Sequence, residues 1–152
     1  VMDAIDASRI QNAGIDAIWV SNHGGRQLDG SPPALLALPK IRDSVGPSMP
    51  LIFDSGVRSG EDIVKALALG ANFVMLGRPI MMAIAASSEK GLNDYLSLLK
   101  EEIEVVMAQL GLKDLSKISG DVLYNDISGT LQMEIDTANR VEHTRSIINA
   151  KS

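Results

Sequence analysis

The chain has 152 residues, of which 45% are hydrophobic and 22% are charged, a composition typical of one soluble globular domain. Its formal net charge of -5 and its lack of cysteine argue against nucleic-acid and anionic-membrane partners, disulfides and thiolate metal sites. No apolar run reaches the roughly 18 residues that cross a bilayer, and no basic region precedes an apolar one at the N-terminus. We therefore expect a cytoplasmic protein, with a peroxisomal or mitochondrial location left open.

Three short apolar runs predict buried strands, over residues 15–20, 51–53 and 72–76. The segments around them show helical spacing and predict helices over residues 3–13, 34–45, 61–69, 80–86 and 89–110. Ser31 is the expected N-cap of the second helix, and Gly70 is expected to end the third. Because strand, loop and helix recur in that order, the pattern indicates an α/β fold with a parallel sheet or part of a (β/α) barrel.

The loop after the first predicted strand combines a proton carrier with a cation, in the sequence S-N-H-G-G-R-Q over residues 21–27. The imidazole of His23 can take a proton near neutral pH, and the guanidinium of Arg26 can hold a carboxylate through two parallel hydrogen bonds. The two glycines between them allow both side chains to turn toward one small ligand. This loop favours an anionic substrate, although a histidine and an arginine this close also occur in loops without such a role.

The loops after the next two strands make the pattern more specific. They carry D-S-G-V-R over residues 54–58 and G-R at 77–78. Glycine lets backbone amides approach an anion, helix N-termini add positive potential, and arginine donates charge-assisted hydrogen bonds. Together these loops predict a phosphate site, which in barrels is often formed by the loops after the last two strands.

Residues 1 to about 118 resemble the FMN-dependent α-hydroxy-acid oxidases and dehydrogenases, the glycolate oxidase and lactate oxidase family, through S-N-H-G-G-R-Q, D-S-G-V-R-S-G and L-G-R-P. The resemblance implies the C-terminal portion, about three βα units, of a (β/α)8 barrel with FMN at its C-terminal face. We expect residues 119–152 to form a C-terminal helical tail of the same domain.

The resemblance also implies a role for each motif residue. His23 would be the catalytic base, and Arg26 would bind the substrate carboxylate. Ser21 would lie near the flavin ring, and the remaining cofactor-binding residues would be Asp54, Ser55, Gly56, Arg58, Gly77 and Arg78. The implied reaction is FMN-dependent oxidation of an L-2-hydroxy acid, such as lactate or glycolate, to the 2-oxo acid. The exact acid, the electron acceptor and the choice between hydride and carbanion chemistry stay open.

A complete barrel needs roughly 200 residues or more, so most of the barrel is not found in this chain. We expect the isolated chain to be inactive, and to require the N-terminal barrel half or to self-associate as a homo-oligomer. The alternative is a non-catalytic half-barrel that binds phosphate compounds or associates through its exposed strand edges. Either way the partner is a small molecule or another polypeptide.

A few remaining residues receive structural interpretations. Trp19 and the pair Met81 and Met82 are expected to pack in the core. Asp29 suits loop hydrogen bonding at least as well as ligand binding. Residues 142–143, Glu and His, are interpreted as an exposed part of a last helix over 137–150 rather than as a metal site.

Overall fold

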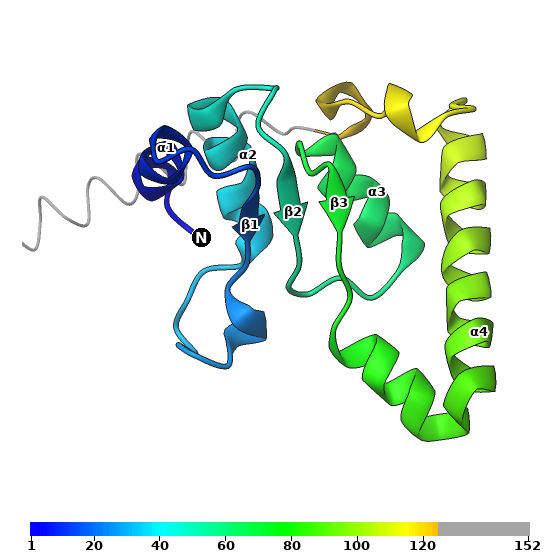
Figure 1. The fold of residues 1–152 in the computed structure, drawn as a ribbon. Coiled ribbons are helices and arrows are strands. Elements are labelled where there is room, and N and C mark those ends of the chain that lie inside the picture. The colour runs from blue at the N-terminus through cyan, green and yellow to red at the C-terminus, as the bar shows by residue number, and fades with distance from the viewer. Residues whose placement is uncertain (125–152) are drawn as a thin grey trace, which may run out of the picture.

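The computed structural model describes residues 1–124, so the predicted last helix and the pair Glu142 and His143 lie outside the described residues. One parallel sheet has the strand order β1 (Ile18–Val20), β2 (Leu51–Phe53), β3 (Phe73–Val74). The α-helices are α1 (Ala4–Asn12), α2 (Ala34–Val45), α3 (Gly60–Ala68) and α4 (Arg78–Gln109). Figure 1 shows α2 and α3 behind the sheet, α1 beside α2, and α4 beside α3. The predicted alternation of parallel strands and helices is confirmed.

Short 3₁₀ helices complete the described part of the chain, at His23–Gly25, Leu115–Lys117 and Gly120–Val122. Within residues 1–124, the structure contains no helix that is both long enough and apolar enough to cross a bilayer.

The start of α2 differs from the prediction. The residue that caps α2 is Pro33, and within the described part of the chain no side chain bonds to the first amides of this helix. Ser31 is followed by Pro32 and Pro33, and a residue that precedes proline is held away from helical backbone angles. Pro32 precedes Pro33 and so cannot take the helical angles of a first helical residue, which moves the start of α2 beyond Pro33. The prediction of Ser31 as N-cap is therefore wrong.

Helix α4 bends sharply where the sequence predicted two separate helices to part. The break lies at Ser87 (φ -157°, ψ 37°) and Ser88 (φ 48°, ψ -133°). Gly91 packs against the other side of the break so closely that a Cβ there would lie 2.0 Å from the carbonyl oxygen of Ala83. The two arms of α4 are therefore held at a fixed angle by close backbone packing that only glycine permits.

One face of the sheet is covered and the other is open. Ile18, Val20, Leu51 and Phe53 are at most 1% exposed and pack with the helices. On the opposite face the strand register aligns Trp19, Ile52 and Phe73, of which Trp19 is 47% and Phe73 63% exposed. The strands are thus buried on one face among the described residues, and the prediction that Trp19 packs in the core is wrong there.

The outer edge of β1 is partly occupied by the first residue of the chain. The amino group of Val1 donates to the carbonyl oxygen of Trp19 at 2.8 Å, and the amide of Ser21 donates to the carbonyl oxygen of Val1 at 3.3 Å. This is the slanted bonding pattern of a parallel neighbour. Val1 therefore lies beside β1 as a further parallel strand would, while the outer edge of β3 is open among residues 1–124.

The Arg42 side chain of α2 ties together the N-terminal ends of β2 and β3. Its guanidinium donates to the carbonyl oxygens of Gly46, Met49 and Gly70 and to Oδ1 of Asn72, at 2.6–3.0 Å. Burial lowers the pKa of this guanidinium from its ordinary value. We expect it to remain charged, because arginine stays protonated in proteins. The bonds therefore join three elements through one charged group.

We predict that Arg42→Ala lowers the free energy of unfolding by about 2–4 kcal/mol, because hydrogen bonds to charged groups contribute more than neutral ones and several carbonyls lose their partner. Urea unfolding followed by circular dichroism measures the change. The matched control is Arg9→Ala, since Arg9 is 76% exposed in its side chain and pairs with the exposed Asp6. Equal losses in the two variants would contradict the role given to Arg42.

Candidate functional site

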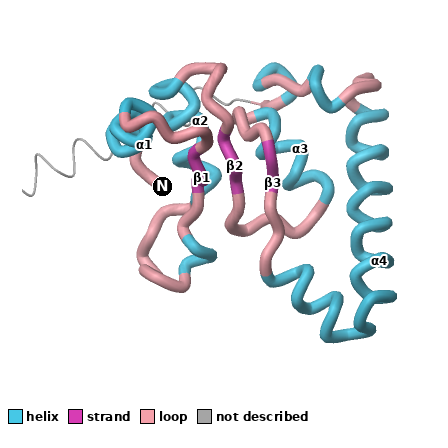
Figure 2. Tube along the Cα trace, in the orientation of Figure 1, coloured by secondary structure: helices cyan, strands magenta, loops and turns pink. Residues whose placement is uncertain are grey.

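The three loops that follow the strands meet at the carboxyl edge of the sheet (Figure 2). They line an open cavity of about 540 Å³, within the range of roughly 300–1,000 Å³ typical of small-molecule sites. Its lining includes eight of the nine predicted site residues: His23, Arg26, Asp54, Ser55, Gly56, Arg58, Gly77 and Arg78. Ser21 is the ninth, and its Oγ lies 3.3 Å from Oγ of Ser55, just behind this lining.

The loop after β1 is held in a left-handed conformation at three successive residues. His23, Gly24 and Gly25 have φ angles of 58°, 67° and 77°. Such angles are free of strain for glycine and uncommon for histidine. The side chain of Asn22 accepts from the amide of Gly24 at 3.0 Å and stabilises the turn. This unusual backbone brings His23 and Arg26 into the lining of one cavity, as the sequence predicted.

Ser55 links the loop after β2 to the loop after β1. Its hydroxyl contacts the Oγ of Ser21 at 3.3 Å, the amide of Gly24 at 3.2 Å and the carboxylate of Asp54 at 3.2 Å. Its φ angle of 87° is left-handed, which costs a residue with a Cβ about 1 kcal/mol or more and suits glycine better. The serine therefore accepts local strain and gains hydrogen bonds that fix the two loops relative to each other.

The N-terminus of α3 is occupied by carboxylates of the chain itself. Asp62 accepts from the amides of Arg58 at 2.9 Å and Ser59 at 3.2 Å, in a capping box with Ser59. Glu102 of α4 accepts from the amide of Gly60 at 2.6 Å. The expectation that helix N-termini add positive potential to the site thus fails for α3, because two negative side chains already offset its dipole.

The N-terminus of α4 is open by contrast. This helix begins at Arg78 after Gly77, and no side chain of residues 1–124 caps it. The amides of Gly56, Val57, Gly77 and Arg78 make no hydrogen bond to other residues of the described chain. Uncapped helical amides carry a partial positive charge and are suited to an anion. The open amides therefore lie in two of the loops at the edge of the cavity.

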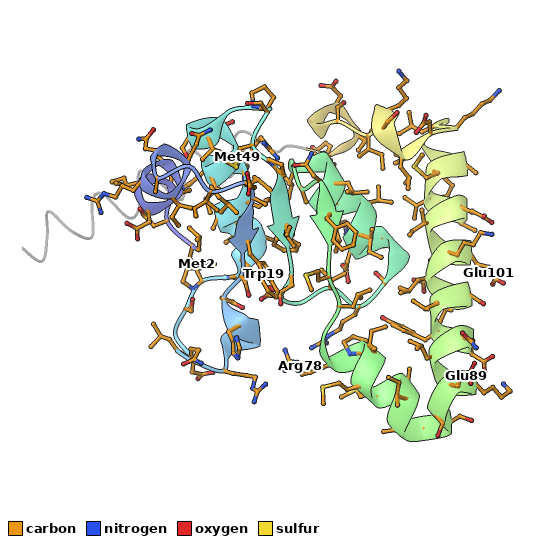
Figure 3. The ribbon with its side chains drawn as sticks, viewed as in Figure 1. Met2, Trp19, Met49, Arg78, Glu89 and Glu101 are labelled. Atoms are coloured by element: carbon orange, nitrogen blue, oxygen red, sulfur yellow. The ribbon has the colours of Figure 1, made fainter. Side chains whose placement is uncertain are left out.

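The side chains around the cavity are strongly cationic although the chain as a whole is acidic. Arg26, Arg58 and Arg78 line it with a single carboxylate, Asp54, while the whole chain has a net charge of -5. Figure 3 shows Arg78 extending from the start of α4 toward the loop after β1, where its Nη2 lies 3.4 Å from the carbonyl oxygen of Gly24. A concentration of guanidinium groups in an acidic protein favours an anionic ligand.

Some residues of the lining were not predicted to lie at the site. Met81 and Met82 were expected in the core, but they are 70% and 68% exposed and line the cavity, so that expectation is wrong. Tyr95 of α4 also lines it and donates its hydroxyl to the carbonyl oxygen of Arg58 at 2.8 Å. Helical spacing places Tyr95 on the apolar face of α4, which is a signal for burial, but nothing in the sequence connects it with Arg58.

Burial raises the pKa of the Tyr95 hydroxyl, and the nearby carboxylates of Glu102 and Asp62 raise it further. Tyr95 therefore stays a hydrogen-bond donor through neutral and mildly alkaline pH.

Asp29 is exposed and lines a neighbouring cavity of about 410 Å³ rather than the one that contains His23.

A sequence model of the family described as FMN-dependent dehydrogenase matches residues 1–125. The L-lactate oxidase of Alicycliphilus denitrificans (strain DSM 14773 / CIP 107495 / K601) is 47% identical over 123 residues, which cover 81% of this chain and 34% of that protein.

Solved structures of two proteins are also similar to this chain. The monotopic membrane protein (S)-mandelate dehydrogenase is 43% identical with a TM-score of 0.79, over 83% of this chain and 33% of that one. Mandelate oxidase with (S)-2-phenylpropionate is 42% identical with a TM-score of 0.73, over 76% of this chain and 35% of that one. The chain thus spans about a third of the length of these relatives.

Proposed function

The chain belongs to the FMN-dependent dehydrogenase family, whose members oxidise 2-hydroxy acids, and on that premise we propose what its own residues contribute. The chain supplies the base, the carboxylate-binding residue and the FMN-phosphate segments of an enzyme that oxidises an L-2-hydroxy acid to the 2-oxo acid. The observation that carries this proposal is the cavity in which His23 and Arg26 meet the open N-terminus of α4.

The cavity suits the phosphate end of FMN. A phosphate dianion needs several donors, and this edge offers the unbonded amides of Gly56, Val57 and Gly77 together with the guanidinium groups of Arg58 and Arg78. Because α3 is already capped by carboxylates, the proposed phosphate position is the α4 side of the cavity.

Polar groups nearer the sheet suit the rest of the cofactor. The proposed contacts of the ribityl chain and ring edge are Ser21, Asp54 and Ser55, and the hydroxyl of Ser55 hydrogen bonds to the other two side chains. When bound, FMN would accept the two electrons of the oxidation.

The substrate side of the cavity is proposed to be the loop after β1. Arg26 would hold the carboxylate with its planar pair of donors, which fixes the acid relative to His23. His23 would take the proton that leaves the substrate as it is oxidised. The left-handed backbone at residues 23–25 keeps both side chains at the same cavity and reduces the motion needed to reach that arrangement.

We further propose that this chain works together with a polypeptide that completes the barrel. The open sheet face contains Trp19 and Phe73, and exposed apolar residues aligned across a sheet need a covering partner. The acidic net charge of the chain argues against a nucleic acid as that partner.

The proposal is tested by titrating the chain with FMN and following the quenching of flavin fluorescence. Arg78→Ala is expected to raise the Kd for FMN by about 10- to 100-fold, since it removes a charge-assisted hydrogen bond to the phosphate. Lys100→Ala is the matched control, because Lys100 is 77% exposed in its side chain and pairs with Glu104 on α4. If the two variants bind FMN equally well, the proposed phosphate position is wrong, and a colourless protein indifferent to FMN favours the non-catalytic alternative.

A further inference from the structure

The backbone of residues 58–60 is held from outside its own loop by α4. Tyr95 donates its hydroxyl to the carbonyl oxygen of Arg58 at 2.8 Å, and Glu102 accepts from the amide of Gly60 at 2.6 Å. Tyr95 and Glu102 are seven residues apart, which is about two turns, so they lie on the same face of the helix. A Cβ on Gly60 would lie 2.6 Å from the Cβ of Glu102, which shows how closely the two elements pack here.

Both arms of the same helix line the cavity, through Arg78, Met81 and Met82 on the first arm and Tyr95 on the second. Its first arm begins at Arg78, directly after Gly77, and its second arm carries Tyr95 beyond the break at Ser87 and Ser88. The angle between the arms is set by the contact of Gly91 with Ala83 described above. One bent helix therefore fixes the separation between Arg78 and the segment that bears Arg58.

We propose that Tyr95 is a positioning residue for the phosphate group of the cofactor, acting through Arg58. This inference rests on the function proposed above. The hydroxyl proton of Tyr95 is already used by the Arg58 carbonyl, so Tyr95 holds that peptide rather than donating to the ligand itself. With the peptide held, the Arg58 side chain remains in the same cavity lining as Arg78, so that two guanidinium groups can share one dianion.

A packing role alone for Tyr95 explains less of the geometry around its hydrogen bond to the Arg58 carbonyl. Tyr95 is partly buried and makes its bond to the exposed loop rather than to a neighbouring turn of α3, so simple helix packing does not require the hydroxyl. Asp62 already fixes the amide of Arg58, and Tyr95 adds the carbonyl, so the peptide groups on both sides of this residue have partners. Such double fixation is typical of a residue whose orientation matters to a ligand.

The test compares the two tyrosines of the 152-residue chain. Tyr95→Phe keeps the ring and removes the hydroxyl, and it is expected to raise the Kd for FMN by about 3- to 10-fold, the loss of one hydrogen bond. Tyr124→Phe is the matched control, because Tyr124 is 94% exposed and lies outside the cavity lining, and its Kd should equal that of the unchanged chain. Both titrations are made well below the thermal unfolding midpoint of each variant.

A double variant separates positioning from general packing. In the Arg58→Ala background the further change Tyr95→Phe should alter the Kd by less than about 2-fold, because the side chain that Tyr95 positions is gone. A loss of the same size in both backgrounds would show that Tyr95 acts by packing alone and would overturn the inference. An unchanged Kd for Tyr95→Phe alone would overturn it while leaving the proposed function intact. Failure of the unchanged chain to bind FMN, or of Arg78→Ala to weaken binding, would remove the proposed function and this inference with it.

Discussion

Alone, the 152-residue chain is expected to oxidise glycolate and lactate below the detection limit. The sheet of the described residues has three parallel strands, and a (β/α)8 barrel closes only with eight. The face that carries Trp19, Ile52 and Phe73 is the one a barrel would enclose, and here Trp19 and Phe73 are largely exposed. A cavity open on that side admits water to the reacting groups, which weakens the electrostatic stabilisation on which catalysis depends.

The measurement is the rate of reduction of an artificial electron acceptor by the purified chain with added FMN and either acid. Activity should appear when a polypeptide that supplies the rest of a family barrel is refolded together with the chain. The matched control is the same mixture with Gly60→Ala in the chain, because a Cβ there would lie 2.6 Å from the amide nitrogen of Ile103 and separate α3 from α4. Robust oxidation by a verified monomer of the 152-residue chain would contradict this prediction.

The sequence could predict the arrangement of the loops because parallel strands impose it. Once residues 15–20, 51–53 and 72–76 are recognised as successive parallel strands, the loops that follow them must lie at the same edge. His23, Arg26, Arg58 and Arg78 therefore met at one cavity as expected, although they are up to 55 residues apart in numbering. The residue types in the loops and the common direction of parallel strands were sufficient to predict that these side chains share one site.

The covering of the strands could not be predicted in the same way. An apolar strand indicates that something packs on it, but apolarity does not say whether that partner lies within the same 152 residues. Trp19 faces the side of the sheet without helices, so it is exposed although its neighbours Ile18 and Val20 are buried. Met81 and Met82, near the start of α4, are likewise apolar side chains that are exposed among the described residues.

Whether a helix N-terminus is capped also depends on residues that are distant in the sequence. Glu102 is 42 residues from Gly60 and Tyr95 is 37 residues from Arg58, and no local pattern in the sequence connects them. The capping box of Ser59 and Asp62 is local in the sequence, but the prediction of positive potential at helix N-termini did not take it into account. The end of α4, preceded by a glycine without a side chain, leaves the helix N-terminus at the cavity available to an anion.

In the completed barrel, His23→Ala is expected to lower kcat by about 10²- to 10⁴-fold, the usual contribution of a general base. FMN should remain bound, because the proposed phosphate donors lie in the two other loops, at Gly56, Arg58, Gly77 and Arg78. Steady-state kinetics with the hydroxy acid gives kcat, and the visible flavin spectrum of the same sample gives the bound cofactor.

Two further variants show whether the loss is specific to the base. Arg26→Lys keeps the positive charge but loses the planar pair of donors, so it should mainly raise KM. His143→Ala removes the other histidine of the chain and should leave kcat unchanged. Alanine and histidine both carry a Cβ, so alanine at position 23 meets the left-handed angle of 58° with similar strain, while Gly24 and Gly25 keep the rest of the turn. A His23→Ala enzyme that retains FMN and full turnover would show that another group takes the proton.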